Sequence, residues 1–98
     1  TLYNPAHNRR SSELSNSELK TIGVKGNNSG FRVVNGSHKD AMNFVMSQTH
    51  GLSEYAPGKF VGYNSSGVEF RVFPKVMDGY TSIRIYGVEG LKGIKFIW

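Results

Sequence analysis

The sequence contains no cysteine among its 98 residues. This absence excludes a disulfide scaffold and any metal site built on thiolates, and it fits a domain that works in a reducing cytosol. Acidic residues are also few, seven against twelve lysines and arginines, which leaves a net charge of +5. No apolar run approaches the roughly 20 residues needed to cross a bilayer, so we expect no stable membrane insertion of this domain.

Several motifs that are typical of a metal or cofactor site are missing as well. The three histidines, His7, His38 and His50, show no metal-ligand spacing such as His-x-x-x-His. The glycine-rich stretch from Gly26 to Gly30 is neither a GxGxxG fingerprint nor a P-loop. We therefore expect no metal and no cofactor, and we interpret His50 as a charge that complements the end of a helix.

The chain is long enough for one hydrophobic core but not for two. Its basic character favours an anionic partner, with nucleic acid first and an acidic protein second. The sequence begins at Thr1 without a start methionine or a signal peptide, as a piece of a longer protein would. We expect residues 1–12 to be a linker or arm from a larger parent and residues 13–98 to form a single domain.

The first half of the chain predicts two helices with a strand between them. Ser15 and Glu18 have the spacing of a capping box, in which the serine and the glutamate each bind a free backbone N–H. Phe31–Val34 is a short apolar strand. A second helix begins after Ser37, shows an apolar face with a period near 3.6, and is expected to end at Gly51.

The second half predicts strands only. Alternating segments are separated by turn residues, as in an antiparallel meander. The expected strands are Lys59–Tyr63, Val68–Phe73, Thr81–Tyr86 and Ile94–Trp98. We therefore predict an α+β fold, with N-terminal helices packed on one face of a four- to five-stranded antiparallel sheet, and no helix after residue 60.

Strand alternation sorts the side chains onto two faces. The expected core is Phe44, Val45, Phe60, Val68, Phe70, Val72, Ile83, Ile85, Ile94 and Phe96, and Trp98 shares its parity. The opposite face carries Glu69, Arg71, Phe73, Ser82, Arg84, Tyr86 and Lys95. Cations hold phosphates and rings stack on unpaired bases, so this face could bind RNA. An ordinary solvated sheet face with cross-strand ion pairs has the same composition.

RNA cleavage without a metal uses the 2′-hydroxyl to attack the adjacent phosphate. It needs a base for the hydroxyl proton, an acid for the leaving oxygen, and positive charge at the phosphoryl oxygens. The candidate catalytic residues are Arg71, Thr81, Glu69 and Lys59, with Glu69 as the base and Arg71 as the phosphate clamp. The candidate substrate-binding residues are Ser82, Arg84, Lys75, Tyr86 and Lys95.

Residues 30–98 resemble the tRNase toxin domains at the C-termini of contact-dependent growth inhibition (CDI) proteins, of the barnase/EndoU/colicin/RelE-like fold group. Four pieces carry the resemblance: Gly36–Phe44 at a helix start, Gly58–Gly62 with the turn Asn64–Gly67, Val68–Arg71, and Thr81–Ile85 with Lys92–Phe96. Two features differ. The family's serine-rich loop after the arginine is here Phe73–Tyr80, with Lys75 and no serine, and Arg84 stands near the family's acidic position.

The resemblance implies cleavage of tRNA in the cytoplasm of a target cell, after delivery as part of a secreted or cell-surface parent. It also implies a cognate immunity protein and, in some members, dependence on elongation factor Tu. Two other interpretations stay open. One is a non-catalytic RNA-binding module that uses the same basic face, and the other is a structural or protein-interaction domain.

Overall fold

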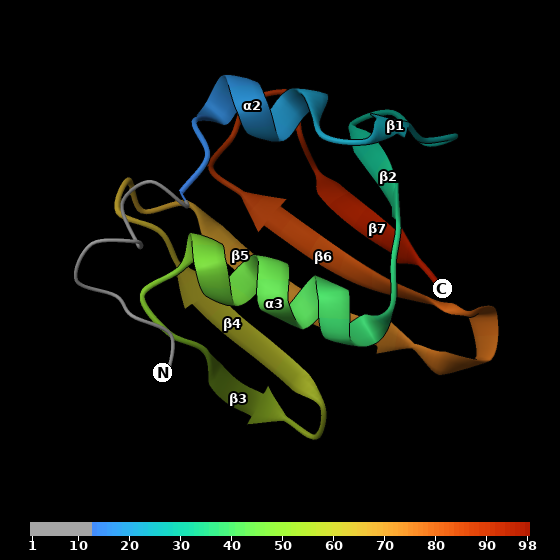
Figure 1. Ribbon diagram of the computed structural model, residues 1–98. Coiled ribbons are helices and arrows are strands. Elements are labelled where there is room, and N and C mark those ends of the chain that lie inside the picture. Colours follow the sequence, from blue (N-terminus) through green and yellow to red (C-terminus); the bar gives the residue numbers. More distant parts are fainter. Residues whose placement is uncertain (1–12) are drawn as a thin grey trace.

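The computed structural model describes residues 13–98, which form a single sheet with helices on one side (Figure 1). The helices are α2 (Asn16–Thr21) and α3 (His38–Gln48), and a short 3-10 helix, η1 (Val76–Asp78), follows later. The strands are β1 (Val24–Lys25), β2 (Phe31–Asn35), β3 (Ser53–Ala56), β4 (Lys59–Tyr63), β5 (Glu69–Lys75), β6 (Tyr80–Tyr86) and β7 (Gly93–Ile97).

The seven strands lie in the order β1-β2-β7-β6-β5-β4-β3. All neighbouring pairs are antiparallel except β2 and β7, which are parallel. The predicted α+β class is confirmed, but the prediction of a purely antiparallel sheet of four or five strands was wrong. Alternation within a strand predicts which side chains are buried. It does not predict the parallel pair, because no turn connects β2 to β7.

Both helices begin where the sequence predicts. Ser15 and Glu18 form a complete capping box at α2, and Ser37 and Asp40 form another at α3. The main helix, α3, ends earlier than predicted: its C-cap is Thr49 and not Gly51. The Thr49 hydroxyl donates to the carbonyl of Val45 at 2.9 Å, so a side chain satisfies a terminal carbonyl without a left-handed glycine.

The core lies between α3 and the central strands. Every predicted core residue is buried except Phe44 and Phe60, which are partly buried against it. Trp98 has the expected parity but is 47% exposed, because it stands at the end of the sheet. Four residues join the core that the alternation of the strands did not indicate: Leu19, Ala41, Val88 and Leu91.

Three elements were missed by the sequence prediction. The two edge strands β1 and β3 are short, and most of their side chains are exposed, so they lack an apolar alternation. The 3-10 turn η1 contradicts the expectation of no helix after residue 60. It lies in the loop predicted between Pro74 and Gly79, and Gly79 closes it in the left-handed conformation (φ 76°).

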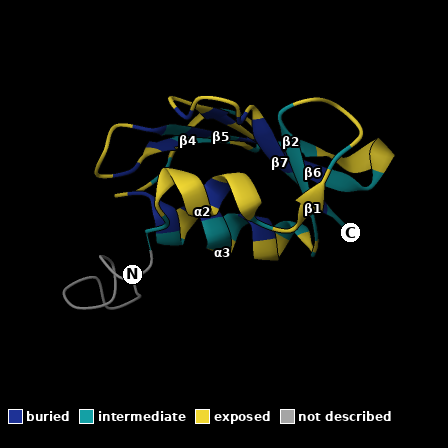
Figure 2. Cartoon of the chain, turned by 90° about the horizontal axis from the view of Figure 1, so that it is seen from above, coloured by how far each residue is buried: buried dark blue, intermediate teal, exposed yellow. Residues whose placement is uncertain are grey.

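Both helices lie on the same side of the sheet, and no other described element covers the opposite side (Figure 2). This uncovered side is called the open face below. The linker or arm predicted at residues 1–12 falls outside the described residues. Within residues 13–98, no helix has the length and apolarity required to span a membrane.

Phe70 tests the assignment of the two faces, because its side chain is fully buried under α3. We expect Phe70→Ala to lower the free energy of unfolding by about 3–5 kcal/mol, since truncating a buried aromatic leaves a large cavity. Phe73, three residues on, faces the open side and is only partly buried, so Phe73→Ala is the matched control with a smaller loss. Urea denaturation measures both, and a loss below about 1 kcal/mol for Phe70→Ala would mean that the faces are inverted.

Candidate functional site

Directly paired residues form rows across the open face. One row runs through Val61, Arg71, Arg84, Gly93 and Phe31, from β4 to β2. The two arginines are therefore opposite each other on adjacent strands. Like charges directly opposite each other destabilise a sheet. An anion that contacted both guanidinium groups would offset this repulsion.

Glu69 partly compensates the charge of one arginine. Arg71 Nε donates to Glu69 Oε2, and the hydroxyl of Tyr63 donates to Glu69 Oε1 at 3.1 Å. The side chain of Glu69 is 19% exposed and that of Arg71 is 42% exposed. The hydrogen bond to Glu69 raises the pKa of Arg71 above its ordinary value, so the guanidinium is charged at any working pH. The terminal nitrogens of Arg71 have no hydrogen-bond partner in residues 13–98 and are available to a phosphate.

Aromatic rings surround this ion pair. The guanidinium carbon of Arg71 is 5.4 Å from the centre of the Tyr55 ring and 5.8 Å from that of Tyr86. Lys59 Nζ is 5.6 Å from the ring centre of Phe73, which in turn meets Tyr55 edge-on. Cations within about 6 Å of ring centres are attracted to the π faces, so these contacts hold the charges in place on the exposed face.

A second group of cations and rings lies on the other half of the open face. Lys95 Nζ is 5.4 Å from the ring centre of Phe31 and 5.0 Å from that of Tyr80. Arg84 Cζ is 5.9 Å from the Phe31 ring. No acidic side chain of the described residues forms an ion pair with Arg84 or Lys95. This half of the face therefore carries uncompensated positive charge.

The structure brings most of the predicted site residues together on this face. These residues share one parity on β5 and β6, or occupy the corresponding positions on β4 and β7. They are Lys59, Glu69, Arg71, Lys75, Ser82, Arg84, Tyr86 and Lys95. Lys75 stands apart at the end of β5, opposite Tyr80. Ser82 is paired with both Phe73 and Lys95 and is 6% exposed.

Thr81 is the exception. It shares the parity of Ile83 and Ile85, is fully buried, and faces the helices, so it cannot bind the same phosphate as Arg71. Its hydroxyl lies 2.9 Å from His38 Nδ1 and accepts the indole N–H of Trp98 at 3.0 Å. All three groups are satisfied if the hydroxyl donates to an unprotonated Nδ1. We therefore assign Thr81 to the packing of α3 and not to the open-face site.

Four aromatic residues of the open face were missed by the sequence prediction: Phe31, Tyr55, Tyr63 and Tyr80. Tyr63 and Tyr80 had a local signal, since each has the parity of a predicted face residue on its own strand, Lys59 in β4 and Ser82 in β6. Phe31 and Tyr55 had none, because they reach the face through the parallel pairing of β2 and through an edge strand with no apolar alternation.

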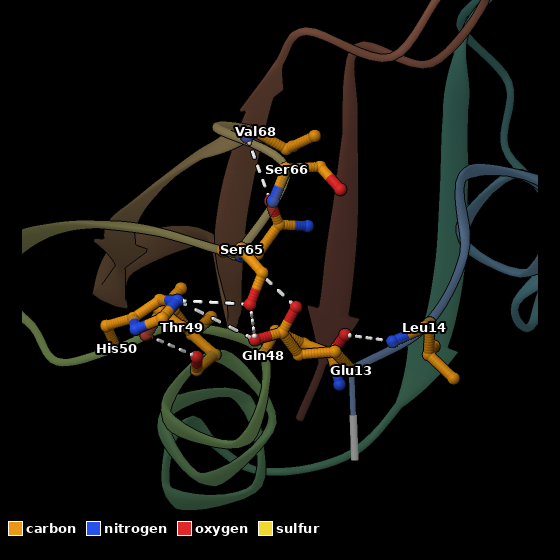
Figure 3. A network of polar contacts seen from close by, with 10 residues as sticks. Glu13, Leu14, Gln48, Thr49, His50, Ser65, Ser66 and Val68 are labelled. Carbon is orange, nitrogen blue, oxygen red and sulfur yellow. Dashed lines mark hydrogen bonds and ion pairs between the residues drawn. The ribbon is translucent and has the colours of Figure 1, made fainter. Parts of the chain in front are cut away.

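A separate polar network joins the segment before α2 to the turn after β4 (Figure 3). Glu13 accepts from the backbone N–H of Ser65 at 3.1 Å and from its hydroxyl at 2.8 Å. His50 Nε2 lies 3.2 Å from that hydroxyl and 3.9 Å from Glu13, so His50 contacts this network instead of the terminal carbonyls of α3. A pocket of about 720 Å³ lies beside it, lined by two carboxylates and no lysine or arginine. Because its charge disfavours a polyanion, we place the candidate site on the open face.

Residues 13–98 contain no group of three or more histidine, aspartate or glutamate side chains arranged to hold a metal ion.

The contact between Tyr63 and Glu69 has a pH signature. The hydrogen bond to Glu69, together with the carboxylate charge, raises the pKa of Tyr63 above 10.0, because both oppose formation of the phenolate. We expect Tyr63 to deprotonate at higher pH than a free tyrosine, and Glu69→Gln to lower its pKa by removing the charge. NMR titration of ring-labelled tyrosine measures this, with Tyr63→Phe for assignment and Glu89→Gln as the control. An unchanged Tyr63 pKa in Glu69→Gln would contradict the contact.

Comparison with known proteins gives no relative. No family model matches the chain, and neither the curated proteins nor the solved structures contain a significant match.

Proposed function

We propose that this chain is an endoribonuclease domain that binds tRNA on the open face and cleaves it through the 2′-hydroxyl, without a metal. The observation that carries the proposal is the pairing of Arg71 with Arg84 on adjacent strands of an uncovered sheet face. A polyanion that lies across both strands relieves the repulsion between the two arginines, and RNA supplies a phosphate at every nucleotide.

The arrangement of cations and rings supports an RNA ligand over a compact anion. Arg71, Arg84, Lys59 and Lys95 are spread over four strands and alternate with aromatic rings. A small anion needs convergent donors, whereas an RNA strand needs phosphate contacts separated by surfaces for its bases. The proposed ligand is thus an extended nucleic acid with unpaired bases.

The cleavage step assigns one role to each group near Arg71. Glu69 accepts the proton of the 2′-hydroxyl, the 2′-oxygen bonds to phosphorus, and the bond to the 5′-oxygen breaks as that oxygen takes a proton from water, which leaves a 2′,3′-cyclic phosphate and a 5′-hydroxyl. Each oxygen of Glu69 already accepts one hydrogen bond, and each retains a second lone pair for the incoming proton. The free nitrogens of Arg71 stabilise the charge on the phosphoryl oxygens, and Lys59 adds positive charge on the same face.

A second candidate function is a non-catalytic RNA-binding module. Two observations favour it: the open face of residues 13–98 carries no histidine, and both oxygens of Glu69 are engaged. Binding needs only the charges and rings. Incubation of the purified domain with total tRNA, with and without EDTA, separates the two functions. Cleavage products in both reactions support the nuclease, and a stable complex with intact tRNA supports the module.

The biological setting follows from the resemblance to CDI toxin domains and belongs to the same proposal. The domain is delivered as part of a secreted or cell-surface parent, acts in the cytoplasm of a target cell, and is neutralised by a cognate immunity protein. Elongation factor Tu is a further proposed partner, because some members of that family depend on it.

Arg71→Lys tests the catalytic role. Lysine retains the charge but loses the planar fork that binds Glu69 and a phosphate together. We expect tRNA cleavage to fall roughly a hundredfold, the scale of a lost transition-state donor, while the fold stays intact. Gel analysis of tRNA under single-turnover conditions gives the rate, and circular dichroism monitors folding.

Arg32→Lys is the matched control. Arg32 lies on the helix side of the sheet, where it donates to the carbonyls of Thr21, Ile22 and Gly23 at the end of α2. The same substitution there should leave the cleavage rate of the folded protein unchanged. A folded and fully active Arg71→Lys would place the chemistry elsewhere, and the histidines would be the next positions to test.

The immunity protein is expected to be acidic and to cover the open face. Opposite charges accelerate the encounter, and coverage of Arg71 and Arg84 excludes RNA. Arg84→Glu should therefore slow association by roughly tenfold or more at low salt, as measured by surface plasmon resonance. An immunity protein that binds the helix side and is insensitive to Arg84→Glu would contradict occlusion.

A further inference from the structure

Phe31 lies directly on the backbone of a neighbouring strand. It is paired with Gly93 in the parallel register of β2 and β7. A Cβ atom at residue 93 would stand 2.8 Å from the Phe31 ring and 2.6 Å from the carbonyl oxygen of Ile83. A side chain at residue 93 would therefore clash with both groups. Because glycine has none, the Phe31 ring can pack over β7 on the open face.

The backbone around Phe31 is held on both sides. The N–H of Phe31 donates to the carbonyl of Asn28 at 3.2 Å, and its carbonyl accepts from Gly26 at 2.8 Å. The carbonyl of Gly30 accepts from Lys92 at 2.7 Å, which ties the start of β2 to β7. Since the ring is only partly buried, it offers surface to a ligand from a backbone that is already ordered, and this lowers the entropic cost of binding.

Two cations flank the ring without a balancing anion. Arg84 and Lys95 approach Phe31 from the strands β6 and β7. The open-face residues of β2, β6 and β7 include no aspartate or glutamate. By contrast, Arg71 on the other half of the face has its Glu69. The group around Phe31 thus combines an apolar ring with two uncompensated positive charges.

We propose that Phe31, Arg84 and Lys95 form a binding subsite for one unpaired nucleotide of an RNA substrate. Arg84 and Lys95 move from the Phe31 ring to the adjacent phosphate, and the base stacks on the ring face that they leave. The subsite rests on the proposed function, because it requires that RNA binds the open face. It goes further by naming what is recognised: a base that is free of pairing, since a paired base has no face available for a protein ring.

The subsite predicts a preference for single-stranded over duplex RNA at this half of the face. The opposite view is that the cations only pack against the ring and that any anion binds equally well. The two views differ in one measurable quantity, the contribution of the base itself to affinity.

The test uses fluorescence anisotropy with labelled 2′-O-methyl oligoribonucleotides, which lack the nucleophilic hydroxyl and are not cleaved. Each strand is compared with an abasic strand of the same length and charge. Wild-type protein should bind the base-bearing strand more tightly. Phe31→Leu, which keeps an apolar side chain over Gly93, should weaken that binding roughly tenfold and leave the abasic strand unaffected. Phe31→Tyr, which keeps the ring, should restore the preference.

Charge variants complete the experiment. Lys95→Ala should weaken the binding of the base-bearing and the abasic oligoribonucleotide to a similar degree. It should also reduce the salt dependence of binding, as expected for a lost phosphate contact. Lys39→Ala, an exposed lysine of α3 on the helix side, removes the same charge and should change neither. Thermal unfolding of every variant verifies the fold.

The outcomes distinguish a failure of the subsite from a failure of the proposed RNA binding. If Phe31→Leu binds the base-bearing strand as tightly as wild type, or weakens both strands equally, the subsite is overturned while RNA binding stands. If wild-type protein binds neither strand, the proposed function fails and the subsite with it.

Discussion

The packing of α3 against the central strands is the constraint on which the rest of the molecule depends. Phe70, Ile83 and Ile94 are buried beneath the helix, and each is followed or preceded by residues that must point the other way. Once the apolar side chains are buried on one side of the sheet, the charged side chains between them must face the other side. The open face is thus a consequence of the core, and a slip of one residue in register would exchange the two.

The register also decides which charges meet. Arg71 is opposite Arg84 because Val72 is opposite Ile83. This arrangement places two cations where the sheet alone would favour opposite charges. Glu69 and the rings of Tyr55, Tyr86 and Phe31 compensate part of the repulsion, and the remainder is a standing attraction for an anion. A local violation of this kind is expected at functional sites, in agreement with the proposed ligand.

The two halves of the open face differ in chemistry. On the β4–β5 half, the carboxylate of Glu69 contacts both an arginine and a phenol, and we propose this carboxylate as the base beside the phosphate clamp. On the β2–β7 half, cations and rings occur without a carboxylate, which suits holding an RNA strand in place. The hydrogen bonds between Glu13 and Ser65 and between Leu14 and Gln48 attach residues 13–14 to the rest of the domain. Binding and chemistry are therefore proposed on adjacent parts of one surface.

The sequence by itself determined the α+β class, the N-caps of both helices, most of the core, and the residues of β5, β6 and β7 that share the open face with Arg71. These features follow from local rules: capping distances, helical period and strand alternation. The tertiary structure alone decided the parallel pairing of β2 with β7, the short edge strands, and the burial of Thr81 against His38. It also decided the place of Phe31 over Gly93 and of Tyr55 beside Arg71. Each of these joins residues far apart in the chain, and contacts of that kind depend on how the whole core packs, which no local pattern encodes.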